Sequence, residues 1–557
     1  MPEDLQDSPD PGPSSALGVP IFRAIWFASV GSNFGGLVQA VGASWLMTTL
    51  TDSPQYVALV QASTALPIML FALLAGAIAD NLDRRTVMIC AQGFMLVAST
   101  LLAVCAWYGV LTPWLLIGFT FAIGCGTAMN NPAWQASVGD MVPRDLLPNA
   151  VALNSMGFNI ARSVGPAVGG AIVAAAGAAA AFATNALSYV ALLAVLVRWR
   201  PDTAPRTLPR ERLDLAITAG VRYVAMSPNI RAVLLRSVFF GMAAAAVPAL
   251  LPVVANDIMS GGPLVLGTLL GSFGVGAVAG ALSSGRVRKR YSTEWIVRTA
   301  SVAVVIGTAI TGASTMLFVT MPALMLAGAG WVWALSTFNV SVQMAAPRWV
   351  VARALSLYQM VTFGGMAFGS WLSGYTATHY SIPVALFCAA ALMAMTALLG
   401  LVRPLRQIEN VDLAPLDHWR EPETAVPLEP RSGPVVITVE HRIAEKDVVA
   451  FLNVMNERRR ICRRDGFKRW TLLRDLEDPQ LWIERFHVPT WLDYVRDAQR
   501  RTKADATIYE QVEKLHIPGK PAIVHRMIER QPGSMPTAQQ PGGRELADPL
   551  TDVTRAS

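Results

Sequence analysis

The chain has 557 residues, of which 53% are hydrophobic and 15% are charged, and its formal net charge is +7. A soluble protein of this length carries more charge and fewer unbroken apolar segments, so the composition indicates a membrane protein with soluble additions. The basic residues fall in loops between apolar segments. Membrane topology therefore accounts for the positive charge better than a nucleic-acid partner does.

The N-terminal segment and the cysteines carry little functional signal. Residues 1–19 are rich in Pro, Ser and Asp and lack the basic region and cleavage site of a signal peptide, so we expect a disordered N-terminus there. Four of the five cysteines lie in apolar segments and Cys462 lies in a polar region. Because no Cys-x-x-Cys or Cys/His spacing occurs, we expect no disulfide framework, no metal site and no cofactor.

The apolar segments predict twelve transmembrane helices, at about 20 residues per crossing. Each span must be helical, because hydrocarbon offers no partner to an unpaired backbone group. The predicted spans lie near 21–50, 54–79, 85–108, 113–139, 149–176, 178–198, 230–256, 263–285, 293–313, 316–343, 353–378 and 382–402.

The distribution of Lys and Arg predicts the orientation in the membrane. Connections that follow odd-numbered spans contain neither residue. Those that follow even-numbered spans hold Arg84, Arg85, Arg144, Arg198, Arg200, Arg206, Arg210, Arg212, Arg286, Arg288, Lys289, Arg290 and Arg348. Cytoplasmic loops carry the excess of basic residues, so both termini are predicted to be cytoplasmic.

The long basic loop divides the spans into two groups of six that match each other. Gly76 and Gly280 are 280 − 76 = 204 residues apart, and the same shift relates the pairs Arg84 and Arg288, Arg85 and Lys289, Gly124 and Gly328, Pro143 and Pro347, Gly165 and Gly369, and Gly170 and Gly374. We therefore expect an all-α membrane protein with six-helix bundles at 20–200 and 230–402 and a cytoplasmic loop at 201–229. Two parallel repeats of this kind are an architecture of secondary transporters.

The C-terminal region has a different composition. A polar, proline-rich linker at 403–432 leads to a compact pattern at 433–530, and residues 531–557 are expected to be disordered. Hydrophobic periodicity predicts strands at 435–443, 467–474, 481–488 and 522–528 and helices at 445–464 and 491–515. The order βαββαβ is that of a ferredoxin-like α+β domain.

The turn between the second and third spans resembles motif A of the major facilitator superfamily, through Gly76, Asp80, Arg84 and Arg85. The resemblance implies that Asp80 faces the N-terminal end of the eleventh helix and that Arg84 pairs with Asp140, forming a gate. The second copy keeps Gly280, Arg288 and Lys289 but has Ser284 in place of the acid. The alternative is a basic turn that fixes topology without gating.

The fifth predicted helix resembles motif C, which marks the antiporter branch of the superfamily, through Gly165, Pro166, Gly169 and Gly170. The match is partial, and small residues also serve simply to pack helices. Arg162 lies about 20 Å along this helix, near the membrane midplane. A cation at that depth is a candidate substrate residue or one half of a structural ion pair.

Further polar and aromatic residues are candidates for a substrate cavity, because the resemblance implies that helices one, four, seven and ten line it. They are Gln39, Asn130, Asn131, Arg236, Trp331, Trp333 and Asn339. Each of them alone has an equally good explanation as a packing or hydrogen-bonding residue. No Asp or Glu lies in the middle of a predicted span, so the coupling ion is left open.

The C-terminal domain resembles the antibiotic-biosynthesis-monooxygenase-like dimeric α/β barrels, in the stretches VVITVEHRI, GFKRWTLLRD and LWIERFHVPTWLDYV. The resemblance implies a pocket around His441, His487, Trp470 and Trp482, although such residues are also ordinary in sheets. It further implies pairing of two such domains as a homodimer, or binding of a cytosolic partner.

The whole arrangement resembles the transmembrane secretion effector branch of the superfamily, which includes enterobactin exporters and macrolide efflux proteins. This resemblance implies export of a siderophore or drug-like molecule across the bacterial inner membrane by alternating access and ion-coupled antiport. It predicts a transporter and not an enzyme, with the lipid bilayer and a small molecule as partners. The alternatives are an importer of the same fold and a membrane-anchored enzyme with the C-terminal domain as catalyst.

Overall fold

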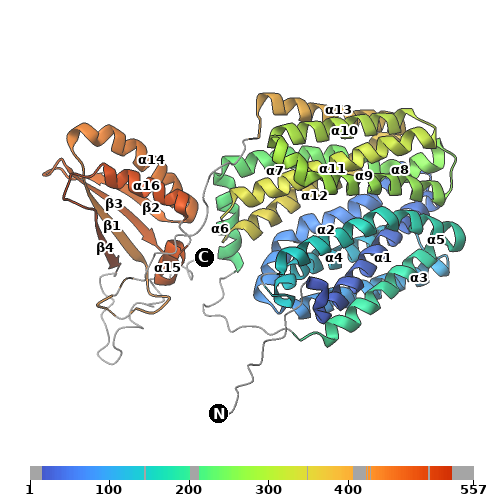
Figure 1. Ribbon diagram of the computed structural model, residues 1–557, viewed down its shortest axis with the longest axis horizontal. Helices are drawn as coiled ribbons and strands as arrows, with labels where there is room; N and C mark the ends of the chain where they lie inside the picture. Colours follow the sequence, from blue (N-terminus) through green and yellow to red (C-terminus); the bar gives the residue numbers. More distant parts are fainter. Residues whose placement is uncertain are drawn as a thin grey trace, which may run out of the picture. The chain divides into compact units, whose positions relative to one another are not determined.

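The computed structural model describes residues 15–143, 146–200, 213–347, 349–405, 422, 424–426, 428–499 and 502–529 (Figure 1). The chain divides into a helical unit, Met1–Ile217 with Pro228–Val342 and Arg353–Gln407, and a second unit, Thr218–Ser227 with Gln343–Ala352 and Ile408–Ser557. The predicted tail at 531–557 and much of the predicted linker lie outside the described residues.

The helical unit is built from long helices. They are η1 (Ala16–Gly18), α1 (Pro20–Leu50), α2 (Pro54–Asn81), α3 (Arg84–Trp107), α4 (Pro113–Met141), α5 (Leu147–Arg198), α7 (Pro228–Ala244), α8 (Ala246–Val253), η2 (Val254–Ile258), α9 (Pro263–Arg290), α10 (Thr293–Ala313), α11 (Leu317–Ala345), α12 (Val351–His379) and α13 (Ile382–Val402). Among the described residues, nine helical stretches are long and apolar enough to cross a membrane.

Local sequence sets where these helices begin. Proline stands at the first turn of α1, α2, α4 and α9, where its missing N–H group leaves no hydrogen bond unmade. Thr112, Ser292 and Ser381 cap α4, α10 and α13 with side chains that accept from backbone N–H groups. The predicted bounds of the ninth and twelfth spans agree with α10 and α13.

The fifth and sixth predicted spans both lie in α5, as two helical segments that are separated at Gly177. The predicted break at residue 177 is present as a kink, because Gly177 has a φ of 78° that glycine adopts at no steric cost. The seventh predicted span differs more. It is divided into α7, α8 and the short π-helix η2, and Pro252 lies inside α8.

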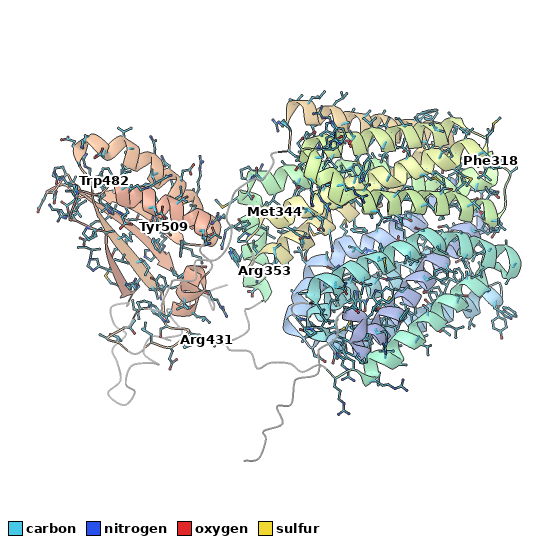
Figure 2. The ribbon with its side chains drawn as sticks, in the orientation of Figure 1. Phe318, Met344, Arg353, Arg431, Trp482 and Tyr509 are labelled. Carbon is cyan, nitrogen blue, oxygen red and sulfur yellow. The ribbon has the colours of Figure 1, made fainter. Side chains whose placement is uncertain are left out.

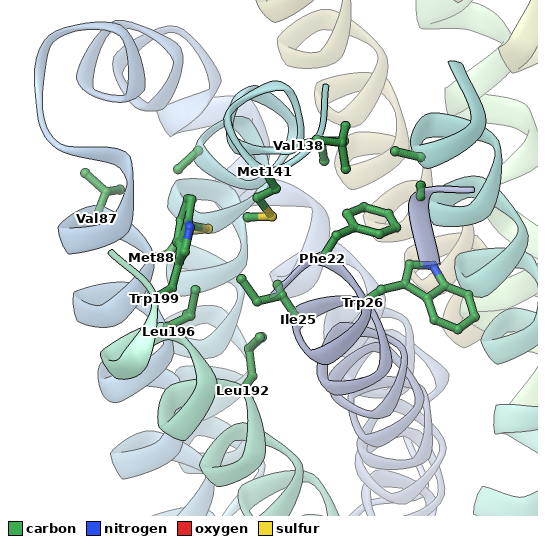
Figure 3. Packing of buried hydrophobic residues seen from close by; sticks show 14 residues of the cluster. Phe22, Ile25, Trp26, Val87, Met88, Val138, Met141, Leu192, Leu196 and Trp199 are labelled. Atoms are coloured by element: carbon green, nitrogen blue, oxygen red, sulfur yellow. The ribbon is translucent and has the colours of Figure 1, made fainter. Parts of the chain in front are cut away.

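A cluster of apolar side chains joins the ends of α1, α3, α4 and α5 (Figure 3). Phe22 and Ile25 of α1 are fully buried there, beside Met88 of α3 and Leu196 of α5. Ala16 is also fully buried, and its N–H group donates to Asn149 Oδ1 at 3.1 Å. The expected disorder through residue 19 is therefore wrong for residues 15–19, because these contacts anchor them.

Glycines bring backbones into direct contact where α5 crosses α9. A Cβ atom on Gly267 would lie 2.9 Å from the Cα of Gly170, closer than such atoms pack. Further along the same crossing, Gly274 faces the carbonyl oxygen of Arg162. Small residues let helices approach closely in this way. The crossing therefore holds α5 directly against α9.

The second unit contains a four-stranded antiparallel sheet with the strand order β2-β3-β1-β4. Its elements are α6 (Leu213–Met226, in this unit from Thr218), β1 (Val435–Arg442), η3 (Glu445–Asp447), α14 (Val448–Asp465), β2 (Lys468–Arg474), β3 (Leu481–Val488), α15 (Trp491–Gln499), α16 (Lys503–Lys514) and β4 (Ile523–Ile528). The predicted strands are confirmed. The predicted helix 491–515 is instead divided in two, and the central loop contains α6.

A buried ion pair lies between the sheet and its helices. Arg458 Nε of α14 donates to both carboxylate oxygens of Glu484 at 2.8 Å, and Trp470 Nε1 donates to Glu484 Oε1 at 2.7 Å. The guanidinium carbon of Arg458 also lies 4.1 Å from the ring centroid of Tyr509. Figure 2 labels Tyr509 and Trp482 in this unit. Burial opposes ionisation of Glu484, but Arg458 and the hydrogen bonds outweigh it and lower the carboxyl pKa to about 2.

The predicted pocket of the C-terminal domain does not form as a single cluster. His441 lies on the helix-covered face of the sheet, with its ring 5.5 Å from that of Phe451, and Trp470 and Trp482 lie on that face as well. His487 is paired with Val436 across the strands. Because side chains alternate along a strand, His487 therefore lies on the opposite face from His441.

We predict that the C-terminal domain loses stability on acidification. Because the pKa of Glu484 in the folded domain is below its usual value of 4.5, its stabilisation is fully present above about pH 4.5 and declines as the pH falls towards 2. Glu484→Gln should remove this dependence and lower stability at pH 7 by about 3–5 kcal/mol, because it leaves the buried Arg458 charge without its partner. Hydrogen exchange of the full-length protein between pH 7 and pH 3 measures both effects. The exposed Glu477→Gln is the control, and an unchanged acid dependence in Glu484→Gln would contradict the assignment.

Candidate functional site

The turn between α2 and α3 is tied to α4. Asp83 caps α3 by accepting from the N–H and hydroxyl groups of Thr86, at 3.1 and 2.6 Å. Arg84 then donates to Asp140 Oδ2 at 2.8 Å and to the carbonyl of Ala136 at 3.0 Å. The predicted pairing of Arg84 with Asp140 is present in the structure.

The same turn is tied to the end of α5 by the second arginine. Arg85 donates through Nε to the carbonyl of Leu196 at 2.9 Å and through Nη2 to that of Val197 at 2.7 Å. These carbonyls belong to the last turn of α5, where a cation interacts favourably with the helix dipole. The basic pair therefore joins the turn to two neighbouring helix ends.

The predicted partner helix of the turn lies beside it. A Cβ atom on Gly76 would be 3.0 Å from the Ser356 hydroxyl oxygen, near the start of α12. This helix corresponds to the eleventh predicted span. The side chain of Asp80 lies outside the described residues, so its proposed latch to α12 stays a prediction.

The second copy of the turn has different contacts. Arg288 donates to the Ser336 hydroxyl of α11 at 3.2 Å, and Lys289 is exposed. Ser284, which stands in the place of the acid, donates to the carbonyl of Gly280 in its own helix at 2.6 Å. A Cβ atom on Gly280 would be 2.8 Å from the carbonyl oxygen of Ala329, so this glycine allows α9 and α11 to pack closely.

A cavity of about 630 Å³ lies within the helical unit, lined on one side by residues of α1–α5 and on the other by residues of α8, α9, α11 and α12. Its N-terminal wall carries amides among apolar side chains, namely those of Asn33, Gln39, Gln61, Gln92, Asn130 and Asn131. Its C-terminal wall is aromatic and apolar, with Phe273, Trp331, Tyr358, Phe363 and Met366. The cavity therefore presents two chemically different faces to whatever occupies it.

Arg162 of α5 lies where the two walls meet. Its guanidinium carbon is 5.7 Å from the ring centroid of Phe273 and 5.8 Å from that of Trp331. These are cation–π distances, and the interaction gains strength as water is removed. Among the described residues, Arg162 has no carboxylate at ion-pair distance and is the one charged side chain of the cavity lining.

Four of the predicted lining residues are in this cavity, namely Gln39, Asn130, Asn131 and Trp331. Two of them belong to hydrogen-bond networks that orient them. Gln39 Oε1 accepts from Ser99 at 2.9 Å and from Asn185 at 2.5 Å, and Asn130 Oδ1 accepts from Gln92 at 3.2 Å. Buried amides that are fixed in this way present defined donors and acceptors to a ligand.

The prediction that Arg236 lines the cavity is wrong. Arg236 is buried and donates to Glu294 Oε1 of α10 at 3.1 Å, while the other oxygen of Glu294 accepts from the N–H group of Leu405 at 2.9 Å. A charge in a low-dielectric interior needs such a partner. Sequence reasoning missed this pair because the two residues are 58 positions apart.

Two further predicted residues lie outside this cavity. The indole of Trp333 donates to the Gly280 carbonyl at 3.0 Å and the Ser283 hydroxyl at 2.9 Å, so it joins α11 to α9. Asn339 has a partner elsewhere and is not among the lining residues. The structure instead adds Phe273 and Tyr358, whose aromatic side chains could not be told apart from core residues in the sequence.

The glycine and proline motif of α5 packs this helix between two neighbours. Gly165 and Gly169 contact Leu37 and Val38 of α1, and Gly170 contacts Gly267 of α9. Pro166 lies within α5, and its carbonyl oxygen would be 2.9 Å from a Cβ atom on Gly267. The motif therefore forms the surface on which α5 meets both α1 and the opposite group of helices.

No cluster of His, Cys, Asp and Glu side chains that could hold a metal ion occurs in the part of the chain that the structure describes.

Long helices around a central cavity form a fold that membrane transporters of known structure share. Solved structures with this fold include the nucleoside transporter NupG (TM-score 0.55, 13% identity, 69% of this chain and 98% of that chain). They also include a bacterial homologue of the human lysosomal transporter Spinster, inward-facing and unoccupied (TM-score 0.55, 13% identity, 69% and 94%). The sequence profile of the transmembrane secretion effector family matches residues 12–532, and the chain belongs to that family.

Relatives of known activity support membrane transport. The staphyloferrin A transporter of Staphylococcus aureus is 26% identical over 262 residues, which cover 46% of this chain and 64% of that protein. The macrolide efflux protein A of Streptococcus pyogenes is 24% identical and is matched over 66% of its length. The enterobactin exporter EntS of Escherichia coli O1:K1 is 24% identical over 64% of this chain and 85% of that protein. The match thus spans less than two thirds of the first two relatives.

We predict that breaking the Arg84–Asp140 pair slows transport without unfolding the protein. Both side chains are about one-third exposed, with side-chain exposures of 29% and 35%, so the pair contributes less than about 1 kcal/mol to stability. Asp140→Asn should lower the transport rate several-fold at unchanged protein abundance, and the exchanged pair Arg84→Asp with Asp140→Arg should recover part of it. Asp52→Asn, in the loop between α1 and α2, is the control. Normal transport in Asp140→Asn would show that the pair has no role in gating.

Proposed function

We propose that this protein exports a small organic anion from the bacterial cytoplasm by alternating access. The observation that carries the proposal is Arg162, a cation beside the rings of Phe273 and Trp331 in the central cavity. A charged side chain at this depth is costly and is retained where it serves binding or translocation. An anionic substrate would supply the countercharge that the described lining lacks.

The two walls of the cavity indicate what the substrate looks like. The amides of the N-terminal wall offer donors and acceptors, and the aromatic wall offers apolar contact. A volume of about 630 Å³ is in the range of pockets that hold drug-sized molecules. We therefore propose an amphipathic anion, with a hydrogen-bonding edge and an apolar or aromatic face. Siderophores carry such groups, whereas macrolides lack the acidic one.

We propose twelve membrane crossings with both termini in the cytoplasm. The nine stretches that meet the length and hydropathy criteria include α5 once and do not include α1 or α12. Gly177 interrupts α5, and the helical segments before and after it, 147–176 and 178–198, are each long enough for one crossing of a hydrocarbon core about 30 Å thick. Counting α1, α12 and a second pass of α5 gives 9 + 3 = 12 crossings, in agreement with the distribution of basic residues.

We also propose that the direction is outward and that an ion moves inward in exchange. The likeness of the α5 motif to motif C supports both, and the names of two relatives specify efflux or export. Import by the same fold is the less favoured alternative. The gate would be the α2–α3 turn, with Asp80 facing α12, a role supported by the proximity of Gly76 to Ser356.

For the C-terminal domain we propose a ferredoxin-like fold without catalytic function. The strand order β2-β3-β1-β4 supports the fold. Catalysis is not favoured, because His441 and His487 lie on opposite faces of the sheet and Glu484 of the buried cluster is satisfied by Arg458 and Trp470. Homodimerisation through this domain stays a prediction.

We predict that Arg162→Gln reduces export of an anionic siderophore at least tenfold. In cells that lack their own exporters, secretion of enterobactin should fall while the amount of protein in the membrane stays constant, because the substrate loses its countercharge. Arg162→Lys should retain part of the activity, since it keeps the charge but loses the planar contact with the rings. Phe273→Ala should also weaken export, by removing one of those rings.

The matched control is Arg231→Gln, an exposed cation in α7. A macrolide, which carries no acidic group, tests the charge dependence in the same cells. Equal losses of enterobactin and macrolide export in Arg162→Gln would contradict an anion site. No secretion of either compound by the wild-type protein would contradict the proposed substrates.

A further inference from the structure

Helix α6 carries a short segment that docks on the C-terminal domain. Residues 218–227 belong to the second unit together with residues 343–352, which connect α11 to α12. Within this unit, Ala219, Tyr223 and Val224 of α6 are buried. Ala219 and Tyr223 lie four residues apart and therefore share one face of the helix.

Arg222 of α6 caps the end of α14. It donates through Nε to the carbonyl of Arg464 at 3.1 Å and through Nη2 to that of Asp465 at 3.3 Å. The last carbonyls of a helix have no partner within it and carry partial negative charge, so a guanidinium is a favourable partner for them. Gly466, which follows with a φ of 110°, leaves the space that the guanidinium occupies.

The ring of Tyr223 contacts a second arginine, which belongs to α14. The guanidinium carbon of Arg464 lies 5.1 Å from the Tyr223 ring centroid. Arg464 is held in that position by Asp465 Oδ1 at 2.9 Å and by Asp505 Oδ1 at 3.0 Å. The burial that accompanies this contact raises the pKa of Tyr223 to about 12. An arginine of α6 thus contacts the end of α14, and an arginine of α14 contacts a ring of α6.

The connection between α11 and α12 meets the same ring. Trp349 lies edge-on to Tyr223, with the two ring centroids 5.7 Å apart and the planes at 82°. Val350, beside it, is fully buried. Tyr223 is therefore the point at which three parts of the chain meet, namely α6, the α11–α12 connection and the C-terminal domain.

We propose that the C-terminal domain is a brace for the helix ends that lead into the gate. Helices α6, α11 and α12 each begin in one unit and end in the other, so their ends move with the domain. α12 starts at Val351, within the docked connection, and Ser356 one turn later is the residue that lies beside Gly76. Docking through Tyr223 orders the start of α12 and supports closure of the gate against it.

The test separates the ring from the hydroxyl group. Tyr223→Leu removes the ring that Arg464 and Trp349 contact, whereas Tyr223→Phe keeps it. Hydrogen exchange of the full-length protein in lipid nanodiscs should become at least tenfold faster in residues 213–226 and 343–358 of Tyr223→Leu, and should be unchanged in Tyr223→Phe. Arg464→Ala should reproduce the effect from the domain side, and the exposed Arg463→Ala on the same helix should not.

Transport provides the second readout, with enterobactin as the probe. Tyr223→Leu should lower the maximal export rate at least threefold and leave the half-saturating concentration unchanged, because the cavity is not altered. Exchange that rises only within the C-terminal domain, or a transport rate that stays the same or increases, would overturn the brace. If the wild-type protein exports no enterobactin, the proposed substrate fails, and the exchange experiment still decides whether the domain orders α12.

Discussion

The structure depends on the free-energy cost of burying charges and unsatisfied hydrogen-bonding groups in a low-dielectric interior. Arg162 meets this constraint with two aromatic rings in a cavity, whereas Arg236 meets it with an ion pair to Glu294. The two arginines appear equivalent in the sequence, yet one is a structural ion pair and the other faces space that a molecule can enter. The two arginines differ in the residues that the neighbouring helices place beside them. This difference makes Arg162, and not Arg236, the candidate for function.

The spans themselves were predictable because hydropathy and length leave few alternatives. α10 and α13 have the predicted bounds, and the break at Gly177 was predicted because the apolar run around it is too long for one span of about 20 residues. The pairing of Arg84 with Asp140 came from resemblance to a known motif, because no local pattern joins residues 56 positions apart. Phe273 and Tyr358 could not be identified as cavity residues, since an aromatic side chain in an apolar helix reads the same whether it faces lipid, core or ligand. The disorder assigned to residues 15–19 failed because a polar composition does not reveal that Ala16 is buried.

The C-terminal domain shows a different limit of sequence reasoning. Its strands were located correctly because alternation fixes which residues enter the core. Its attachment to α6 was not foreseen, because Arg222 and Tyr223 lie in a basic loop whose charge was already explained by topology. The arginines of that loop were used only to predict orientation, whereas Arg222 caps the end of α14.

The glycine contact between α5 and α9 has a consequence for the energy of motion. Where Gly170 meets Gly267, the surfaces of the two groups of helices are backbone atoms without side chains between them. Parting or sliding such surfaces requires no change of rotamer and disengages no interlocked side chains. The resistance to rocking at this contact is then set by dispersion attraction and by whatever fills the gap, whether lipid or water. Lipid composition would in this way act directly on the speed of the transport cycle.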